Sequence, residues 1–327
     1  MPLTLDATTL NALAVLGVIL ALPHLYRLLD FLWLYFLRPD SVKRYLHGRA
    51  PYAIVTGATD GIGKATAAEL LARGFNVVLH GRNEAKMQQV VRELRAQGKG
   101  KGEAGERDIR YFIADAAKAG HDFAKLVEPF GALHVTIVVH NVGGSDLSAA
   151  RIDGHSEDYI LGVVNKNSFF SLFLTRALLP QLRRAAQSGP VQVFFVGSLA
   201  GDIAPVRLPI YAASKGFLES LARGLDNDEQ FLGVDDRPTG VRFGYLSVGA
   251  VHSDNHDAPM PPSLTTPTSA RFARALVDAV GCGRRRVAPY WVHAVLSWLV
   301  ELGPESVADA ASAQEMRGLI ARAEKGK

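Results

Sequence analysis

Apolar positions divide the chain into three stretches with different patterns. Residues 10–37 are almost continuously apolar, which predicts a helix long enough to cross a membrane, since about 20 apolar residues span a bilayer. Residues 53–253 alternate short apolar runs with longer segments of helical period, and a further apolar helix leads into a polar end. We therefore expect three parts: a hydrophobic anchor and linker (1–45), a globular domain (50–290) and a C-terminal helical extension (291–327).

The short apolar runs of the central stretch are the expected strands of one sheet. They lie at 53–55, 76–80, 108–114, 134–139, 191–196 and 241–246. Helical segments separate these strands: the first covers 64–73, the second ends near residue 96, the third leads to Pro180 and the fourth begins at Pro209. The Gly/Lys-rich residues 98–102 are expected to form a flexible loop. Strands that alternate with helices favour a right-handed, doubly wound parallel sheet of the α/β class.

The flanks of the first apolar stretch are those of a membrane anchor. Aromatic residues gather at 31–36, Lys and Arg follow at 38–49, and no Lys or Arg precedes the stretch, which favours a cytosolic body. A cleaved signal peptide is disfavoured, because a basic leading segment and a small-residue cleavage site are both missing. The embedded His24, Arg27 and Asp30 leave open a helix that lies on the membrane or packs on the domain.

Composition narrows the function by exclusion. With 48% hydrophobic and 21% charged residues the chain is globular. Its net charge of +4 comes from scattered Lys and Arg that are not interleaved with aromatic residues, so we expect no nucleic-acid partner. Cys282 is the only cysteine, so no internal disulfide or thiolate cluster can form, and a reducing compartment is expected.

A glycine-rich turn joins the first expected strand to a helix. Residues 56–63 read Thr-Gly-Ala-Thr-Asp-Gly-Ile-Gly. Glycines let the backbone approach a pyrophosphate, and the helix N-terminus faces its negative charge. The strand–turn–helix order predicts a dinucleotide site in a Rossmann-type fold. The candidate contacts are Gly57, Asp60, Gly61, Ile62 and Gly63.

The end of the second expected strand indicates which dinucleotide binds. An acidic residue there would bond the ribose 2′-hydroxyl of NAD, whereas an arginine suits the 2′-phosphate of NADP. The strand ends in Gly81-Arg82-Asn83, followed by Glu84. We therefore expect NADP, held in part by Arg82.

A tyrosine and a lysine form the candidate catalytic pair. Tyr211 and Lys215 lie four residues apart in a helix that Pro209 would begin, so they share one face. A nearby cation favours an ionised phenol, so Lys215 is expected to lower the pKa of Tyr211 from its usual value of about 10. The hydroxyl of Ser198, at the end of the fifth expected strand, would then polarise a substrate carbonyl.

Together these motifs resemble the short-chain dehydrogenase/reductase family over roughly residues 52–253. The turn at 56–63 looks like the family's cofactor turn, and Asn141-x-Gly143 looks like its structural Asn-Ala-Gly. Ser198, Tyr211 and Lys215 look like its catalytic set. Asn167 matches the fourth catalytic position better than Asn165, because of its distance from Pro180.

The resemblance implies a mechanism and further contacts. Hydride would move between nicotinamide C4 and a carbonyl carbon, while Tyr211 exchanges the proton and Ser198 bonds the oxygen. Lys215 would also hold the nicotinamide ribose, and Asn167 would bind a water that relays protons. The other implied cofactor contacts are Asp115, Asn141, Val248 and Ser253, beside Tyr211 and Lys215 themselves.

Within the family, the turn, the Asn-Val-Gly at 141–143 and the apolar N-terminal stretch are most similar to the very-long-chain 3-oxoacyl-CoA reductase and 17β-hydroxysteroid dehydrogenase branch. This implies an enzyme of the endoplasmic reticulum membrane that faces the cytosol, contacts membrane lipid and reduces a lipophilic ketone with NADP, and it leaves a homo-oligomer open. His140, Val248 and Ser253 depart from the common Asn, Pro and Thr. A polyketide or terpenoid substrate therefore stays open. The intact catalytic set disfavours a non-catalytic scaffold.

The remaining motifs have simpler interpretations. His252 and His256 are four residues apart but precede a proline-rich segment, so we expect no metal site and instead a lid up to residue 270, with apolar Met260, Pro261, Pro262 and Leu264. Residues 284–286, three arginines, form a solvated run or contact headgroups or a coenzyme A phosphate. Trp291 and Trp298 are expected to pack in the core. Residues 325–327, Lys-Gly-Lys, loosely resemble a dilysine retrieval signal.

Overall fold

The computed structural model describes residues 6–97, 101–102, 105–253 and 260–325, and it divides the chain into two compact units, Met1–Asp40 and Ser41–Lys327. In the first unit, helix α1 (Ala7–Leu32) continues into a π-helical turn, η1 (Trp33–Leu37). Asp6 caps α1, its carboxylate accepting a bond from the amide of Thr9 at 2.7 Å. By length and composition, residues 7–37 can cross a membrane, as the sequence predicted.

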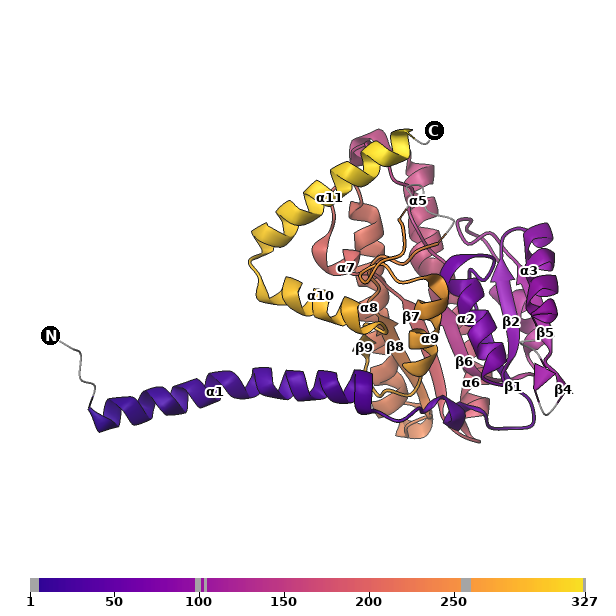
Figure 1. Ribbon diagram of the computed structural model, residues 1–327. Coiled ribbons are helices and arrows are strands. Elements are labelled where there is room, and N and C mark those ends of the chain that lie inside the picture. Colours follow the sequence, from indigo (N-terminus) through magenta and orange to yellow (C-terminus); the bar gives the residue numbers. More distant parts are fainter. Residues whose placement is uncertain (1–5, 98–100, 103–104, 254–259, 326–327) are drawn as a thin grey trace. The chain divides into compact units, whose positions relative to one another are not determined.

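A parallel sheet of seven strands forms the centre of the second unit (Figure 1). The strand order is β5-β2-β1-β6-β7-β8-β9, so it reverses direction between β1 and β6. This confirms the predicted doubly wound, Rossmann-type sheet, and ligands in such folds bind where the order reverses. The strands are β1 (Pro51–Val55), β2 (Asn76–Gly81), β5 (Ile109–Ile113), β6 (His134–His140), β7 (Val191–Val196), β8 (Val241–Leu246) and β9 (Arg286–Val287).

The six expected strands are confirmed to within two residues at each end, while the two-residue β9 was not predicted. Part of the expected loop at 98–102 is also strand, since β3 (Lys101–Gly102) pairs antiparallel with β4 (Gly105–Glu106). Residues 98–100 lie outside the described part. At β9 and at β3 and β4 the chain has no run of apolar residues that is long enough to indicate a strand.

Helices cover both faces of the sheet. The face that carries Ile54, Val193 and Phe243 packs against α6 and α8, while α2, α3 and α9 lie on the other side (Figure 1). The helices are α2 (Gly61–Ala72), α3 (Glu84–Ala96), α4 (Phe123–Val127), α5 (Glu157–Val164), α6 (Phe170–Ala186), α7 (Ala200–Ile203), α8 (Pro209–Phe231), α9 (Ser269–Asp278), α10 (Trp291–Leu302) and α11 (Glu305–Lys325). Short turns are η2 (Val42–Tyr45), η3 (Glu128–Phe130), η4 (Ile152–Gly154), η5 (Asn165–Phe169) and η6 (Val234–Asp236).

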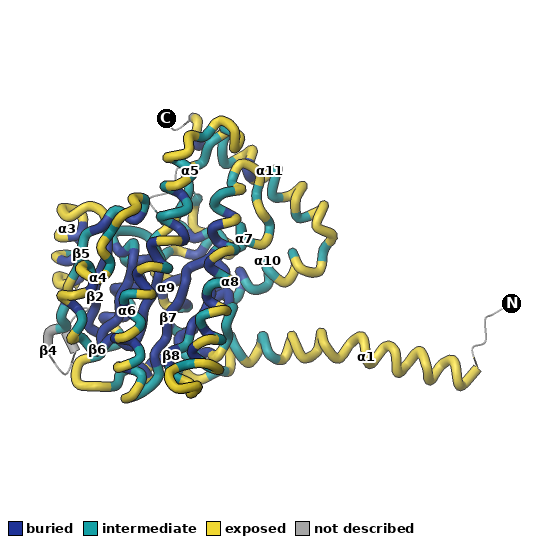
Figure 2. The backbone as a smooth tube through the Cα atoms, turned by 180° about the vertical axis from the view of Figure 1, so that it is seen from behind, coloured by how far each residue is buried: buried dark blue, intermediate teal, exposed yellow. Residues whose placement is uncertain are grey.

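Burial follows this layering. The strands β1, β2, β6, β7 and β8 are buried almost throughout, and the helices expose their outer faces (Figure 2). Pro180 lies on such an exposed face, so helix α6 does not stop there as expected but continues to Ala186. A proline on the solvent side loses one helical hydrogen bond without burying an unpaired group.

The C-terminal extension differs from the prediction at one tryptophan. Trp291 is half-buried at the start of α10, whereas Trp298 is 39% exposed and does not join the core. Leu299, Leu302 and Val307 are also exposed around the turn that joins α10 to α11. Further along α11, Met316 and Ala323 are buried, so this helix packs on the second unit through its C-terminal half.

Candidate active site

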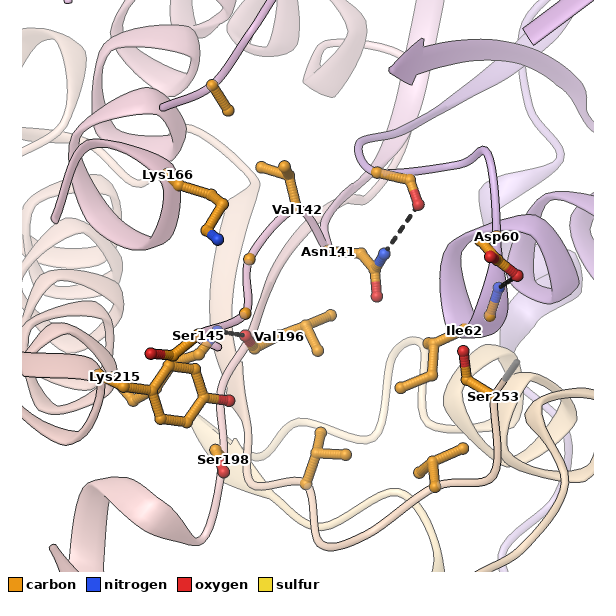
Figure 3. Close-up of a pocket in the computed structure, with 18 of the residues that line it drawn as sticks. Asp60, Ile62, Asn141, Val142, Ser145, Lys166, Val196, Ser198, Lys215 and Ser253 are labelled. Carbon is orange, nitrogen blue, oxygen red and sulfur yellow. Dashed lines mark hydrogen bonds between the residues drawn. The ribbon is translucent and has the colours of Figure 1, made fainter. Parts of the chain in front are cut away.

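A cleft of about 720 Å³ opens at the carboxyl ends of the strands, where the strand order reverses. Asp60 and Ile62 lie on one side of it, and Ser198 and Lys215 lie on the opposite side (Figure 3). The predicted cofactor turn and the predicted catalytic residues therefore face each other across one cleft. Its walls include the predicted residues Gly57, Asp60, Gly61, Ile62, Arg82, Asp115, Asn141, Ser198, Tyr211, Lys215, Val248 and Ser253.

The glycine turn after β1 has the geometry of a phosphate cradle. Gly57 and Gly61 adopt positive φ angles of 64° and 49°, which glycine tolerates. A Cβ on Gly63 would lie 2.2 Å from the carbonyl oxygen of Gly57, so only glycine lets helix α2 approach the strand this closely. Asp60 caps α2 by accepting a bond from the amide of Gly61 at 2.7 Å. The free amides of the helix N-terminus thus face the cleft.

Asn141 holds this turn from the neighbouring strand. Its side-chain amide donates to the carbonyl oxygens of Thr56 and Gly57 at 3.1 and 3.2 Å. The Thr56 hydroxyl oxygen in turn accepts bonds from the backbone amides of Asn141 and Val142 at 2.9 and 3.0 Å. Asn141 therefore fixes the separation of β1 and β6 at the point where the cleft opens.

His80, which the sequence placed only at a strand end, ties the turn to a third strand. Its Nδ1 accepts the amide of Gly57 at 3.4 Å, and its Nε2 donates to the carbonyl oxygen of Ala114 at 3.1 Å. Burial lowers the pKa of His80 to about 4, so the ring is neutral and these two bonds select one tautomer. The only sign of this role in the sequence was a polar residue at the end of an apolar strand. Asp115, next to Ala114, lines the cleft, and its carboxylate accepts the amide of Ala117 at 3.2 Å.

Arg82 stands at the outer end of the cleft, directly after β2. Its side chain is exposed, and it makes no ion pair with any residue that the structure describes. The nearby Lys86 differs, since its ammonium lies 3.1 Å from the Asp60 carboxylate. Glu84 begins α3 and is bonded to Gln88 at 3.5 Å. An available guanidinium next to the phosphate cradle suits an additional phosphate.

The Ser198 hydroxyl is oriented by its own loop. Its oxygen accepts a bond from the backbone amide of Ala200 at 3.1 Å, which leaves the hydroxyl proton free to donate. Helix α8 begins at Pro209, as predicted, and brings Tyr211 to the same wall of the cleft. Burial raises the pKa of Tyr211, and a hydrogen bond with Ser198 opposes this rise.

The expected effect of Lys215 on the pKa of Tyr211 is not found. The Lys215 ammonium lies 5.5 Å from the centroid of the Tyr211 ring and donates to the carbonyl oxygen of Val196 at 2.9 Å. Burial dominates the pKa of Tyr211, so the phenol keeps its proton. Burial and the charge of Lys166 lower the pKa of Lys215 itself to about 8.

Asn167 lies in the π-helical turn η5, fully buried. Its side chain accepts the amide of Gly144 and donates to the carbonyl oxygens of Gly144 and Val163, each at 2.9 Å. A Cβ on Gly143 would lie 2.7 Å from the Asn167 oxygen and 3.1 Å from the Lys215 ammonium, so a glycine here lets the two approach. The π-helical turn thus places Asn167 close to Lys215 of the candidate catalytic pair. Asn165 instead bonds the carbonyl oxygen of Ala117 at 3.2 Å.

The last wall comes from the segment after β8 and from α11. Val248 is buried there, and a Cβ on Gly61 would lie 2.8 Å from the Ser253 hydroxyl. Met316 and Leu319 of α11 also line the cleft, which the sequence did not indicate. His140 is not among the described lining residues; it stacks on Phe195 with ring centroids 4.9 Å apart.

Only part of the expected lid is described, because residues 254–259, including His256, lie outside the described part. His252 bonds the carbonyl oxygen of Met260 at 2.8 Å, and Met260 lines the cleft. Pro261, Pro262 and Leu264 are exposed. Within the described ranges no group of three or more His, Cys, Asp or Glu side chains is arranged to hold a metal.

The arginines at 284–286 are not a free basic patch. Arg285 is paired with Asp226 at 2.8 Å, and Arg286 is paired with Glu219 at 2.8 Å and with Asp202. Arg284 also has a partner. These contacts tie β9 to helices α7 and α8, so the run serves the fold.

Comparisons with known proteins identify the family of the chain. The family model for short chain dehydrogenase matches residues 51–258. Relatives named very-long-chain 3-oxoacyl-CoA reductase are similar over most of the chain. The protein of Schizosaccharomyces pombe is 30% identical over 303 residues, covering 89% of this chain and 84% of its own. That of Pyricularia oryzae is 30% identical over 258 residues, covering 77% and 73%. That of Kluyveromyces lactis is 29% identical over 277 residues, covering 82% and 76%.

Solved structures share the fold. A bulky-bulky ketone specific alcohol dehydrogenase from Comamonas testosteroni has a TM-score of 0.61 at 21% identity, covering 78% of this chain and 92% of its own. A short-chain dehydrogenase from Sphingobium yanoikuyae in complex with NADPH has a TM-score of 0.59 at 18% identity, covering 78% and 96%. At such identities the likeness concerns the sheet and its helices alone.

Proposed function

Because the chain belongs to the short-chain dehydrogenase family, we propose that it is an NADP-dependent reductase that converts the ketone of a lipophilic substrate to a secondary alcohol. The observation that carries this proposal is that one cleft holds both the glycine cradle at the N-terminus of α2 and the hydroxyls of Ser198 and Tyr211. A dinucleotide laid along the cleft from the cradle would end at those two hydroxyls.

The protonation states favour the direction of reduction. Bound NADPH supplies the hydride that a carbonyl carbon accepts. Tyr211, whose pKa burial raises, keeps its proton at neutral pH and gives it to the carbonyl oxygen. Ser198, whose oxygen already accepts the Ala200 amide, donates a second hydrogen bond to the same carbonyl. Lys215 would hold the nicotinamide ribose, and Asn167 would hold the water that restores the proton of Tyr211.

The preference for NADP rests on Arg82. The guanidinium stands beside the cradle without an ion-pair partner among the described residues, and arginine binds phosphate in a bidentate manner. The backbone of the cradle binds the pyrophosphate of either dinucleotide, so Arg82 carries the discrimination.

The substrate class is inferred from the relatives and from the wall of the cleft. This chain matches more than two thirds of the length of each relative named very-long-chain 3-oxoacyl-CoA reductase that is described above. Met260, Met316 and Leu319 present apolar side chains to the cleft beside Val248. We rank a 3-oxoacyl thioester or steroid-like ketone above a polyketide or terpenoid intermediate, because these walls would cover a long apolar chain.

The enzyme would meet such a substrate at the membrane. Helix α1 supplies an anchor of sufficient length, and the Lys and Arg residues that follow it favour a cytosolic body. We place it in the endoplasmic reticulum by analogy with the relatives' lipid chemistry. Carbonate washing of expressing cells should leave the full chain in the pellet, and protease should reach the body in sealed microsomes. Recovery of the full chain in the wash would refute the anchor, and a protected body would refute the orientation.

The function is tested by turnover on a ketone panel. The purified, detergent-solubilised full chain is given NADPH or NADH with 3-oxoacyl-CoA thioesters of increasing length, a steroid ketone, a polyketide-like ketone and a small water-soluble ketone. We expect NADPH oxidation with the lipophilic ketones. Faster turnover of the small ketone would refute the substrate class, and no turnover on any ketone would favour the scaffold.

A further inference from the structure

The backbone of Ser198 is held on both sides by one side chain. The Tyr245 hydroxyl oxygen accepts the amide hydrogen of Ser198 at 3.0 Å, and the same hydroxyl donates to the carbonyl oxygen of Ser198 at 3.1 Å. A tyrosine hydroxyl has one proton to donate, and here it is used on the residue that presents the ketone-binding hydroxyl. Burial raises the pKa of Tyr245, so the donor is present throughout the working pH range.

This contact replaces a strand partner that Ser198 lacks. The pairing of β6 with β7 ends at His140 opposite Phe195, before the chain reaches Ser198. The amides on either side of Ser198, those of Gly197 and Leu199, donate to the β8 side of the sheet at 2.8 and 2.9 Å. The amide of Ser198 itself has no such backbone acceptor among the described residues, and it bonds the side-chain hydroxyl of Tyr245 on β8 instead. Without the hydroxyl of Tyr245, the amide of Ser198 would lose its hydrogen-bond acceptor.

Gly197 makes room for the ring. A Cβ at Gly197 would lie 2.0 Å from Cζ of Tyr245, closer than any side chain can be tolerated. The two positions are therefore matched: a tyrosine at 245 requires a glycine at 197. This explains the glycine before Ser198, to which the sequence pattern alone assigned no role.

The ring is also supported on its far side. The Arg286 guanidinium lies 6.0 Å from the Tyr245 ring centroid and is fixed by Glu219 of α8 and Asp202 of α7. Glu219 belongs to the helix that carries Tyr211 and Lys215. The same cluster thus joins the loop of Ser198 to the helix of Tyr211.

We propose that Tyr245 is a positioning residue, which sets the place of the Ser198 hydroxyl relative to Tyr211 by clamping the Ser198 backbone. This proposal rests on the proposed reductase function. Tyr245 is absent from the described lining of the cleft and touches neither substrate nor cofactor by this account. Its effect is on the geometry in which one carbonyl oxygen receives two hydrogen bonds, where a displacement of about 1 Å is costly.

The first test removes only the hydroxyl. In Tyr245→Phe we expect kcat to fall about tenfold or more, while KM and the Kd for NADPH stay within about twofold. The matched control is Tyr52→Phe, which removes the hydroxyl of another buried tyrosine, bonded to Asp108 at 2.7 Å near the start of the interior strand β1. Equal loss of Tm in both variants with kcat unchanged in both would overturn the proposal.

The second test uses the matched pair. Gly197→Ala should reduce kcat severely, and adding Tyr245→Ala to it should recover part of the loss, because the clash is then removed. A fully active Gly197→Ala would contradict the ring placement, and so would a double variant no better than the single one.

A measurement independent of turnover separates this inference from the proposed function. Amide hydrogen exchange of the peptide over 196–204 should be faster in Tyr245→Phe than in wild type and unchanged in Tyr52→Phe. If wild type reduces no ketone but the exchange behaves as expected, the proposed function fails while the clamp stands. If wild type is active but exchange and kcat are unaffected in Tyr245→Phe, the clamp fails alone.

Discussion

The two sides of the cleft are built in different ways. The cofactor side consists largely of backbone: glycines at 57, 61 and 63, helix amides, and Asn141 and His80 bonded to main-chain atoms. The opposite side consists of side chains contributed by segments far apart in sequence, such as Ser198, Tyr211 and Met316. The cofactor side should thus tolerate little change at its glycines, while the substrate side can be altered one side chain at a time.

The largest expected effect isolates chemistry from binding. Tyr211→Phe should lower kcat about 10²–10⁴-fold, because only the proton donor is removed, while NADPH binding on the other side stays nearly intact. Turnover is measured beside a fluorescence titration with NADPH. Lys215→Ala is the comparison variant and should damage both quantities. Substantial activity in Tyr211→Phe would assign the acid to another residue.

The next effect alters the cofactor side alone. Arg82→Ala should weaken the preference for NADPH over NADH about tenfold to hundredfold, since a charge-assisted phosphate contact contributes about 1.5–3 kcal/mol. KM is measured for both cofactors. Arg92→Ala, exposed on α3, is the matched control and should change nothing. A wild-type protein that prefers NADH would contradict the assignment of NADP as the cofactor.

A smaller effect alters the substrate side alone. Met316→Ser should raise KM for a long-chain 3-oxoacyl thioester about tenfold and leave KM for a small ketone unchanged, because a buried apolar side chain contributes about 1.5–3 kcal/mol. Val307→Ser, 62% exposed on the same helix, is the control. Equal changes for long and short substrates would mean that α11 does not cover the acyl chain.

The smallest effect concerns pH. Because burial and Lys166 lower the pKa of Lys215 to about 8, its charge is present below that pH and lost above it. We expect kcat/KM for NADPH to fall as pH rises through about 8, whereas Tyr211, with its raised pKa, still holds its proton there. Lys166→Met removes the neighbouring charge and should move the fall to higher pH. A fall at the same pH in both proteins would exclude this origin.

The sequence predicted the cofactor side better than the substrate side, for a physical reason. A cradle needs glycine where φ is positive or where a helix touches a strand, and such needs recur at fixed spacing. Strand ends were placed closely because buried parallel strands are short continuous apolar runs. The apolar N-terminal helix was equally clear, since length and hydropathy define it.

What the sequence missed depends on contacts between distant segments. His80 looked like the last residue of a strand, and only the structure shows it joining Gly57 to Ala114. Trp298 was wrongly expected in the core, because an apolar helix does not reveal how much of it is covered. The expected lowering of the Tyr211 pKa by Lys215 was not found, because spacing along a helix does not reveal that burial of the phenol dominates.

The central claim is hydride transfer in this cleft, and isotope transfer tests it most directly. The purified full chain is given NADPH deuterated at nicotinamide C4, on one face or the other, with a long-chain 3-oxoacyl-CoA. We expect one of the two labelled cofactors to pass deuterium to the carbinol carbon of the 3-hydroxy product, and Tyr211→Phe to yield almost no product. A product without deuterium from either label, or no product at all, would contradict it.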